Sequence, residues 1–206
     1  MSTKNDAPRR PRGRPRKFDE TEALEAAMRV FWARGYDGTS IDDLTAAMGL
    51  TRSSLYQAFG GKEALFRAAL DHYGATRIGP VLAALDGGGS VAEDVAGFLE
   101  GVVALGTVDP AHRGCLVSCA LSDAAGAHPE FAELFAERFG LVEAMIADRL
   151  RRAAEEGQLP PGAEPAALGA AIGALAHGLM LRARAGAARE NLSQVARAAR
   201  PLLAAA

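Results

Sequence analysis

The sequence predicts an all-α protein of 206 residues, and three observations support this fold class. Alanine is abundant while aromatic residues make up only 6% of the chain, a composition that favours helix over sheet. Apolar residues recur at spacings of three and four along most of the sequence, as on one face of a helix. Glycines and Ser-x-x-acid patterns stand where those runs end and begin, as helix caps do.

Residues 1–17 form a basic arm that is rich in Pro, Arg and Lys and too poor in apolar groups to fold alone. The whole chain has a net charge of −2, so the arm makes one end of a mildly acidic protein basic, as in proteins that keep one end for nucleic acid. Arg12 and Arg14, each flanked by Pro or Gly, are similar to arginines that enter the minor groove of DNA. The alternative is a solvated tail that adds only non-specific charge.

The first helix is expected from Asp19 to Arg34, with Gly35 ending it. Its apolar face serves to pack beneath the segment that follows. Residues 40–62 then show two short helical patterns separated by a sharp turn at Gly49. Ser40 and Asp43 have the spacing of a capping box, and Thr51 is placed to cap the second of the two helices.

The second of these helices turns Leu55 and Phe59 inward at a spacing of four. Its other face carries polar side chains that can form hydrogen bonds. Two short helices joined by a tight glycine turn are typical of a helix-turn-helix, whose second helix lies in the major groove of DNA.

The segment from Phe18 to about Tyr73 resembles the DNA-binding domain of the tetracycline-repressor (TetR) family of bacterial regulators. The residues that carry the resemblance are Ala27, Phe31, Gly35, Tyr36, Thr39, Ile41, Ala47, Gly49, Leu55, Tyr56, Phe59, Lys62, Leu65 and Phe66. The resemblance implies a flexible basic arm over 1–17, a three-helix helix-turn-helix DNA-binding domain over 18–75, and a helical effector-binding and dimerisation domain over 76–206.

The family pattern also implies which residues contact DNA. Arg52 is expected to recognise a base, because its guanidinium can bond to both O6 and N7 of guanine. Tyr56 matches a position that contacts a backbone phosphate, and Lys62 stands at a helix start, where phosphate is favoured. The full expected set is Arg12, Arg14, Thr39, Ser40, Thr51, Arg52, Ser53, Ser54, Tyr56, Gln57 and Lys62. For Ser40 and Thr51 simple helix capping is the alternative, and both roles can hold together.

The next helix, which includes Ala64 to Tyr73, is expected to transmit an effector signal from body to head, as the family implies. Residues 76–89 contain a Gly-Pro pair and three consecutive glycines, which predict loops around a short apolar segment. Four further helices are expected over 90–106, 114–125, 129–156 and 164–185, and a last one over 191–203.

The helix over 164–185 carries small residues at four-residue spacing, among them Gly169, Gly173 and Ala176. Such a stripe lets another helix backbone come close. The family resemblance implies that this helix and the last one form half of a homodimer interface; internal core packing is the alternative. No apolar run reaches the roughly 18 uninterrupted residues that cross a bilayer, so no membrane partner is expected.

Apolar residues from several of these helices are expected to enclose a pocket for a small hydrophobic effector. The expected lining is Phe98, Val102, Leu105, Cys115, Leu116, Cys119, Phe135, Phe139, Met145 and His177. Ordinary core packing is the alternative for each of these residues taken alone.

His112, Cys115 and Cys119 would share one stripe if their segment were helical throughout. Three interpretations stay open: buried packing of both cysteines, a thiol sensor of oxidants or electrophiles, and a metal site without an evident fourth ligand. The segment around Cys115 resembles that of redox-responsive members of the family. Its position near a helix start, close to His112 and Arg113, would make Cys115 the more reactive thiol.

Motifs of nucleophilic, nucleotide-binding and zinc-dependent enzymes are absent from the sequence, so we expect neither catalysis nor a cofactor. We therefore predict a cytoplasmic, homodimeric DNA-binding regulator, most often a repressor in this family, that leaves a palindromic operator when a small hydrophobic ligand binds or a cysteine is modified. The alternative is a helical ligand-binding or scaffold protein that no longer binds DNA.

Overall fold

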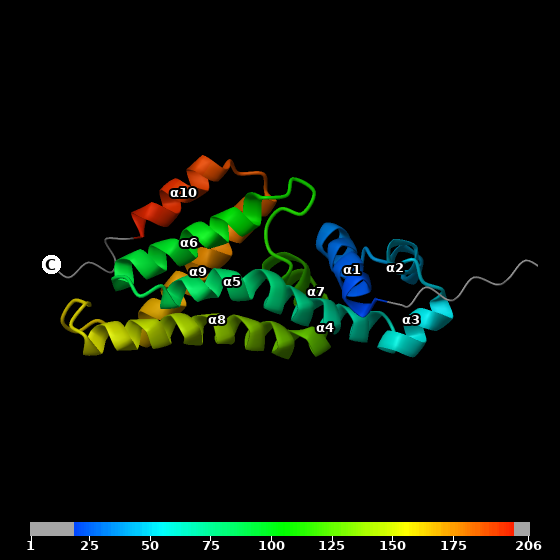
Figure 1. Cartoon of the computed structure of the whole chain (residues 1–206), viewed down its shortest axis with the longest axis horizontal. Coiled ribbons are helices and arrows are strands. Elements are labelled where there is room, and N and C mark those ends of the chain that lie inside the picture. The colour runs from blue at the N-terminus through cyan, green and yellow to red at the C-terminus, as the bar shows by residue number, and fades with distance from the viewer. Residues whose placement is uncertain (1–18, 200–206) are drawn as a thin grey trace, which may run out of the picture.

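The computed structural model describes residues 19–199, in which the regular secondary structure is all helical, with no strand among these residues. Figure 1 shows a compact head at one end and a longer helical body at the other. The head comprises α1 (Glu20–Arg34), α2 (Ile41–Met48) and α3 (Arg52–Phe59) with the start of α4 (Lys62–Tyr73). The body comprises α5 (Gly79–Leu82), α6 (Val91–Thr107), α7 (Ser122–Ala127), α8 (Pro129–Glu155), α9 (Pro165–Arg184) and α10 (Arg189–Ala198).

Local capping chemistry determines where the head helices begin and end. The Ser40 hydroxyl accepts from the Asp43 backbone N–H while the Asp43 carboxylate accepts from the Ser40 N–H, so the predicted capping box is confirmed. The Ser40 hydroxyl also donates to the Asp43 carboxylate at 2.6 Å, and this bond, followed by the one from the Ser40 backbone N–H, lowers the pKa of Asp43 to about 2. Gly49 ends α2 in a left-handed conformation (φ 65°), which glycine adopts without steric cost. The Thr51 side chain then caps α3 by accepting from the Ser54 N–H.

The prediction of loops over residues 76–89 was wrong for most of that segment. The chain runs on from α4 through a wide π-helical turn (Gly74–Ile78) into α5 and a 3₁₀ turn (Ala83–Asp86). Pro80 lacks an N–H and would crowd the carbonyl four residues earlier in a regular helix, and a π turn directly before it is one way to accommodate that ring. The division at residue 75 stays a prediction, because the helical path continues through it.

Helices α6, α8, α9 and α10 pack together in the body, and α8 lies beneath the path of α4 and α5 (Figure 1). The small-residue stripe of α9 faces inward. A methyl group added to Gly169 would lie 3.0 Å from the Ala147 side chain, and one on Gly173 would lie 2.9 Å from Glu143. This stripe therefore packs against α8 of the same chain. A dimer interface formed by α9 and the last helix stays a prediction, and it would use another face of α9.

The opposite face of α9 is exposed and apolar. Ala167, Ala171 and Ala174 are solvent-exposed, and Leu181 is among the most exposed large hydrophobic residues of the described chain. By length and composition α9 is also the one helix within residues 19–199 that could cross a membrane, although His177 and Arg182 interrupt its apolar run. Ile172, Leu179 and Met180 of this helix are buried, as in a helix that packs into a protein core, and the absence of a membrane partner stays a prediction.

The predicted helix over 114–125 begins later than expected. Gly114 adopts a left-handed conformation (φ 80°), and helical hydrogen bonding starts only with a π turn (Val117–Leu121) that leads into α7. His112 therefore lies in a turn, where its Nδ1 is 2.7 Å from Asp109 Oδ2. His112, Cys115 and Cys119 do not form one helical stripe.

Several contacts join the head to the body. Arg138 of α8 forms an ion pair with Asp71 of α4, and Arg67 of α4 donates to the Glu130 carbonyl at the start of α8. Arg184 near the end of α9 donates to the Trp32 carbonyl of α1 at 3.0 Å. A movement of α8 or α9 would therefore change the position of the head.

Candidate DNA-binding surface and effector cavity

Helix α3 presents a polar outer face because Leu55 and the partly buried Phe59 anchor its inner face against the core. Leu55 is completely buried against the head core. Arg52, Ser53, Tyr56 and Gln57 are exposed, and Figure 1 shows α3 at the outer end of the head, away from the body. These are side chains that can donate to or accept from base edges and phosphates.

Arg52 is held by Asp42 of α2. Its Nε and Nη2 atoms lie 2.8 and 2.6 Å from the two carboxylate oxygens of Asp42, a bidentate arrangement. The Arg52 hydrogen bonds lower the pKa of Asp42. Both side chains are about two-thirds exposed, so the pair is weak in water. A guanine that presents O6 and N7 would accept from the same edge of the guanidinium in place of Asp42.

The remaining predicted DNA contacts have different environments. Ser40 and Thr51 are exposed helix caps, and Ser54 is half-buried beside Thr51, whose hydroxyl lies 2.9 Å from the Ser54 hydroxyl. The Lys62 ammonium lies 4.3 Å from the centre of the Tyr36 ring at the start of α4.

Thr39 does not fit its predicted role. Its side chain is buried and its hydroxyl donates to the Gly35 carbonyl at 2.7 Å, so the hydroxyl is not free for a phosphate. Arg12 and Arg14 lie outside the described residues.

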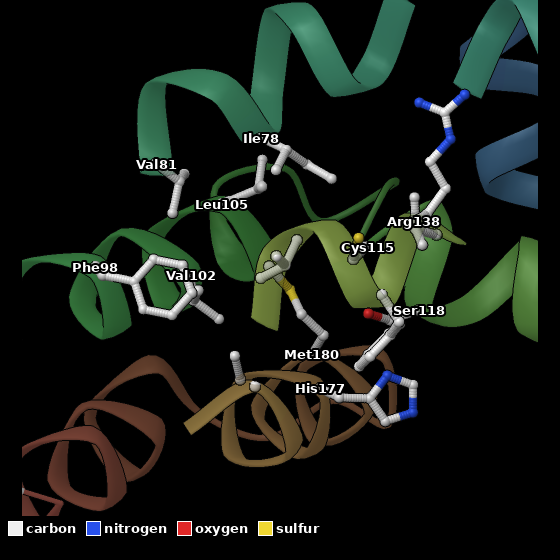
Figure 2. A pocket seen from close by; sticks show the side chains of 15 residues that line it. Ile78, Val81, Phe98, Val102, Leu105, Cys115, Ser118, Arg138, His177 and Met180 are labelled. Atoms are coloured by element: carbon white, nitrogen blue, oxygen red, sulfur yellow. The ribbon is translucent and has the colours of Figure 1, made fainter. Parts of the chain in front are cut away.

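A cavity of about 70 Å³ lies in the body between the α5 path, α6, the π turn before α7, α8 and α9 (Figure 2). Its walls are mainly apolar. The lining residues are Ile78, Val81, Phe98, Val102, Leu105, Cys115, Val117, Ser118, Arg138, Phe139, Val142, Gly173, Ala176, His177 and Met180. At about one water per 10–15 Å³ of such volume, it would hold roughly five or six water molecules, so it suits a small molecule.

Six residues of the predicted pocket line this cavity: Phe98, Val102, Leu105, Cys115, Phe139 and His177. Four do not. Leu116 is completely buried in the core, and Cys119 is turned toward Gly114, where an added methyl group would meet its sulfur at 3.0 Å. Phe135 packs on Phe139 from outside the cavity. Met145 is exposed on α8, because the helical period turns its neighbour Ile146 inward instead.

Sequence reasoning missed several lining residues. Ile78 and Val81 were placed in a loop region, although they are apolar residues three apart, which is a helical signal. Arg138 carries no sequence signal that separates it from the other charged residues of its amphipathic helix. Ser118 and Met180 carry no signal of their own, because only the packing of their helices brings them to the cavity.

Three polar side chains stand out in the apolar lining. The Arg138 Nε and His177 Nδ1 atoms are buried and have no hydrogen-bond partner among the described residues. Burial lowers the pKa of His177, whose ring packs edge-on against Phe139. The third polar group is the Ser118 hydroxyl.

Both cysteines are buried free thiols, and only Cys115 lines the cavity. The groups that were expected to activate it are engaged elsewhere: Arg113 donates to the Ala183 and Ala187 carbonyls, and His112 bonds with Asp109. Burial raises the pKa of Cys119. Within residues 19–199 there is no cluster of three or more His, Cys, Asp or Glu side chains that could hold a metal ion.

Cys115 also lies near the helix that joins head and body. The Tyr73 hydroxyl of α4 is buried without a hydrogen-bond partner in the described chain. Burial, and next the nearby Cys115 thiol, raise the pKa of this phenol well above its usual value. A chemical modification of the Cys115 thiol would therefore alter the surroundings of Tyr73 in α4.

The fold and the exposed α3 define a helix-turn-helix DNA-binding protein. Residues 23–69 match the model of bacterial regulatory proteins of the tetR family, and residues 92–199 match that of tetracyclin repressor-like C-terminal domains. The chain therefore belongs to the TetR family of bacterial transcription regulators. Members of this family are DNA-binding regulators rather than enzymes, and homodimerisation and ligand binding are typical of them.

Individual relatives agree with this assignment. The transcriptional repressor ComR of Escherichia coli (strain K12) is 30% identical over 188 residues, which are 90% of this chain and 89% of ComR. The repressor AcnR of Corynebacterium glutamicum is 27% identical over 175 residues, 84% of this chain and 86% of its own. A cysteine mutant of the TetR-family regulator CifR, complexed with 26-base-pair double-strand operator DNA, has 36% identity and a TM-score of 0.82, covering 91% of this chain and 98% of its own.

Proposed function

We propose that this regulator is a cytoplasmic, homodimeric repressor that binds a palindromic operator through α3 and leaves it when a small apolar molecule enters the cavity. The observation that carries the proposal is the exposed polar face of α3, held on a buried anchor at the outer end of the head. The similar proteins ComR and AcnR are transcriptional repressors, which supports repression, and the operator complex of CifR supports operator DNA as the target.

The dimer would form through the outer face of α9 together with α10. Ala167, Ala171, Ala174 and Leu181 of α9 present small and apolar groups to solvent, a surface that a second copy would bury. Two copies would place their α3 helices about 34 Å apart, in successive major grooves on one side of the DNA.

A ligand in the cavity could move the head because one wall of the cavity belongs to the helical path that continues α4. Ile78 and Val81 of that path line the cavity, so a ligand in contact with them would displace α4 and the head attached to it. Such a ligand shifts the protein away from the DNA-binding arrangement only if it binds the displaced arrangement more tightly.

Modification of Cys115 is a second route to the same displacement. This thiol lines the cavity and lies near Tyr73 of α4, so a group added to its sulfur would occupy the space proposed for the ligand. Oxidants or electrophiles small enough to enter the cavity would then act as effectors without a non-covalent site.

Substitution of both Arg52 and Lys62 by alanine tests the DNA-binding proposal. We expect the wild type to bind a palindromic segment tightly in a fluorescence-anisotropy titration, starting with DNA upstream of its own coding region and extending to a duplex library. The double variant should bind at least about tenfold more weakly, because a base contact and a phosphate contact are lost in each half-site.

The matched control is the Arg151→Ala, Arg152→Ala double variant, which removes the same charge from exposed positions at the far end of α8. It should bind the segment as the wild type does. If the wild type prefers no duplex over a scrambled one, the chain is instead a helical ligand-binding or scaffold protein that no longer binds DNA.

A further inference from the structure

The two sides of the cavity differ in polarity. The side formed by the α5 path and α6 presents only carbon, from Ile78, Val81, Phe98 and Val102 among others. The side formed by the π turn before α7, α8 and α9 carries Ser118, Arg138 and His177, and Figure 2 shows these three on the side away from Phe98. A ligand that fits both sides has an apolar body and one polar end.

Arg138 determines what that polar end is. A guanidinium is always charged and only donates, and its Nε and Nη2 atoms form an edge that matches the two oxygens of a carboxylate. Arg52 uses this edge fully with Asp42. In Arg138 the edge is half used, because Nη2 donates to Asp71 while the buried Nε has no partner. A buried donor without a partner is costly, so an acceptor placed there is favoured.

We infer that the cavity binds a small monocarboxylate with an apolar tail, and that its carboxylate takes the Nε–Nη2 edge of Arg138 in competition with Asp71. The inference deepens the proposed function, on which its regulatory part rests. Asp71 belongs to α4 and Arg138 to α8, so the exchange removes an ion pair that ties the head-bearing helix to the body. Asp71 is 63% exposed and is readily rehydrated when Arg138 is taken from it.

If the ligand competes with Asp71 for Arg138, replacing Arg138 should weaken ligand binding, whereas replacing Asp71 should strengthen it. Arg138→Gln removes the receptor of the carboxylate, and Asp71→Asn removes only its competitor. Both variants lose the same ion pair, so a general loss of stability cannot produce opposite effects on ligand binding. Arg67→Gln is the matched control, because Arg67 also links α4 to α8, through the Glu130 carbonyl, and does not line the cavity.

The first measurement is isothermal titration calorimetry of the full chain with butanoate and with 1-butanol, which share an apolar tail and match the cavity in size. We expect the wild type and Arg67→Gln to bind butanoate at least tenfold more tightly than 1-butanol. Arg138→Gln should lose that preference, and Asp71→Asn should bind butanoate a few-fold more tightly than the wild type. Equal binding of the two probes by the wild type, or an unchanged preference in Arg138→Gln, would overturn the carboxylate site.

The second measurement is anisotropy of the operator complex with and without saturating butanoate. We expect butanoate to weaken DNA binding of the wild type and of Arg67→Gln at least tenfold, and that of Asp71→Asn less than twofold. Equal weakening in Asp71→Asn would overturn the role of the ion pair as the switch. Failure of the chain to bind any operator would contradict the proposed function instead, while calorimetry would still decide the carboxylate site.

Discussion

Cys115 and Cys119 are close in sequence, but their surroundings give the two thiols different reactivity. The Cys119 sulfur is packed against Gly114, and burial raises the pKa of its thiol, so little nucleophilic thiolate forms. Cys115 is just as buried from bulk solvent but forms part of the cavity wall. A reagent that enters the cavity therefore meets Cys115 and not Cys119.

Treatment with N-ethylmaleimide distinguishes the two thiols. We expect the reagent to weaken operator binding of the wild type at least tenfold, because the adduct fills the cavity beside α4. Cys119→Ser should respond as the wild type does, and Cys115→Ser should keep its affinity. Anisotropy before and after treatment, with mass spectrometry to count adducts, checks this. Equal sensitivity of the Cys115→Ser variant would contradict the thiol route.

The residues that could be predicted from sequence are those whose role depends on near neighbours. Ser40 and Thr51 cap helices as expected, because a cap needs only the backbone a few residues ahead. Thr39 and Met145 could not be placed, because their direction depends on which elements pack around them. The unpaired Nε of Arg138 likewise depends on how neighbouring helices pack around this side chain, and no local sequence signal predicts it.

Among the elements, the loop from α6 to the π turn depends on Gly114. Its left-handed conformation would strain any other residue, and an added methyl group would lie 3.0 Å from the Met180 carbonyl and 3.1 Å from the Arg184 side chain. This close approach lets the loop pass α9 and brings Cys115 to the cavity. The sequence carries no signal for this contact, because Gly114 and α9 are far apart in the chain.

Gly114→Ala should therefore lower the free energy of unfolding by about 2–4 kcal/mol, from left-handed strain and overpacking together. Gly140→Ala is the matched control: Gly140 lies in α8 with nothing within 4 Å of an added methyl group. Its replacement should be neutral or stabilise by up to about 1 kcal/mol through helix propensity. Urea unfolding followed by circular dichroism measures both. A Gly114→Ala variant within about 0.5 kcal/mol of the wild type would contradict this role of Gly114.

Helix boundaries were predictable wherever glycine or a cap marks them, as in α2, α3, α6 and α8. They were not predictable where a π turn carries the helix past a usual breaker. Pro80 indicated a loop, yet the widened turn before it lets the helix continue and places Ile78 and Val81 at the cavity. Helical continuity from α4 is what connects cavity and head.

At the scale of the whole molecule, the head was the more predictable half because its contacts are close in sequence. The cavity is assembled from segments up to about a hundred residues apart, and sequence supplied only part of its lining. The outward face of α9 exposes Leu181 and several alanine side chains, which a second copy would cover. Two such copies are proposed to present α3 in two successive major grooves.

The most direct test is operator affinity as a function of half-site spacing. Five extra base pairs between the half-sites turn one of them about half a helical turn away from its α3. We predict that this insertion weakens binding roughly a hundredfold, whereas replacing five central base pairs without changing the length has little effect. An affinity that stays within twofold of the original after the insertion would contradict a dimer that reads two half-sites at once.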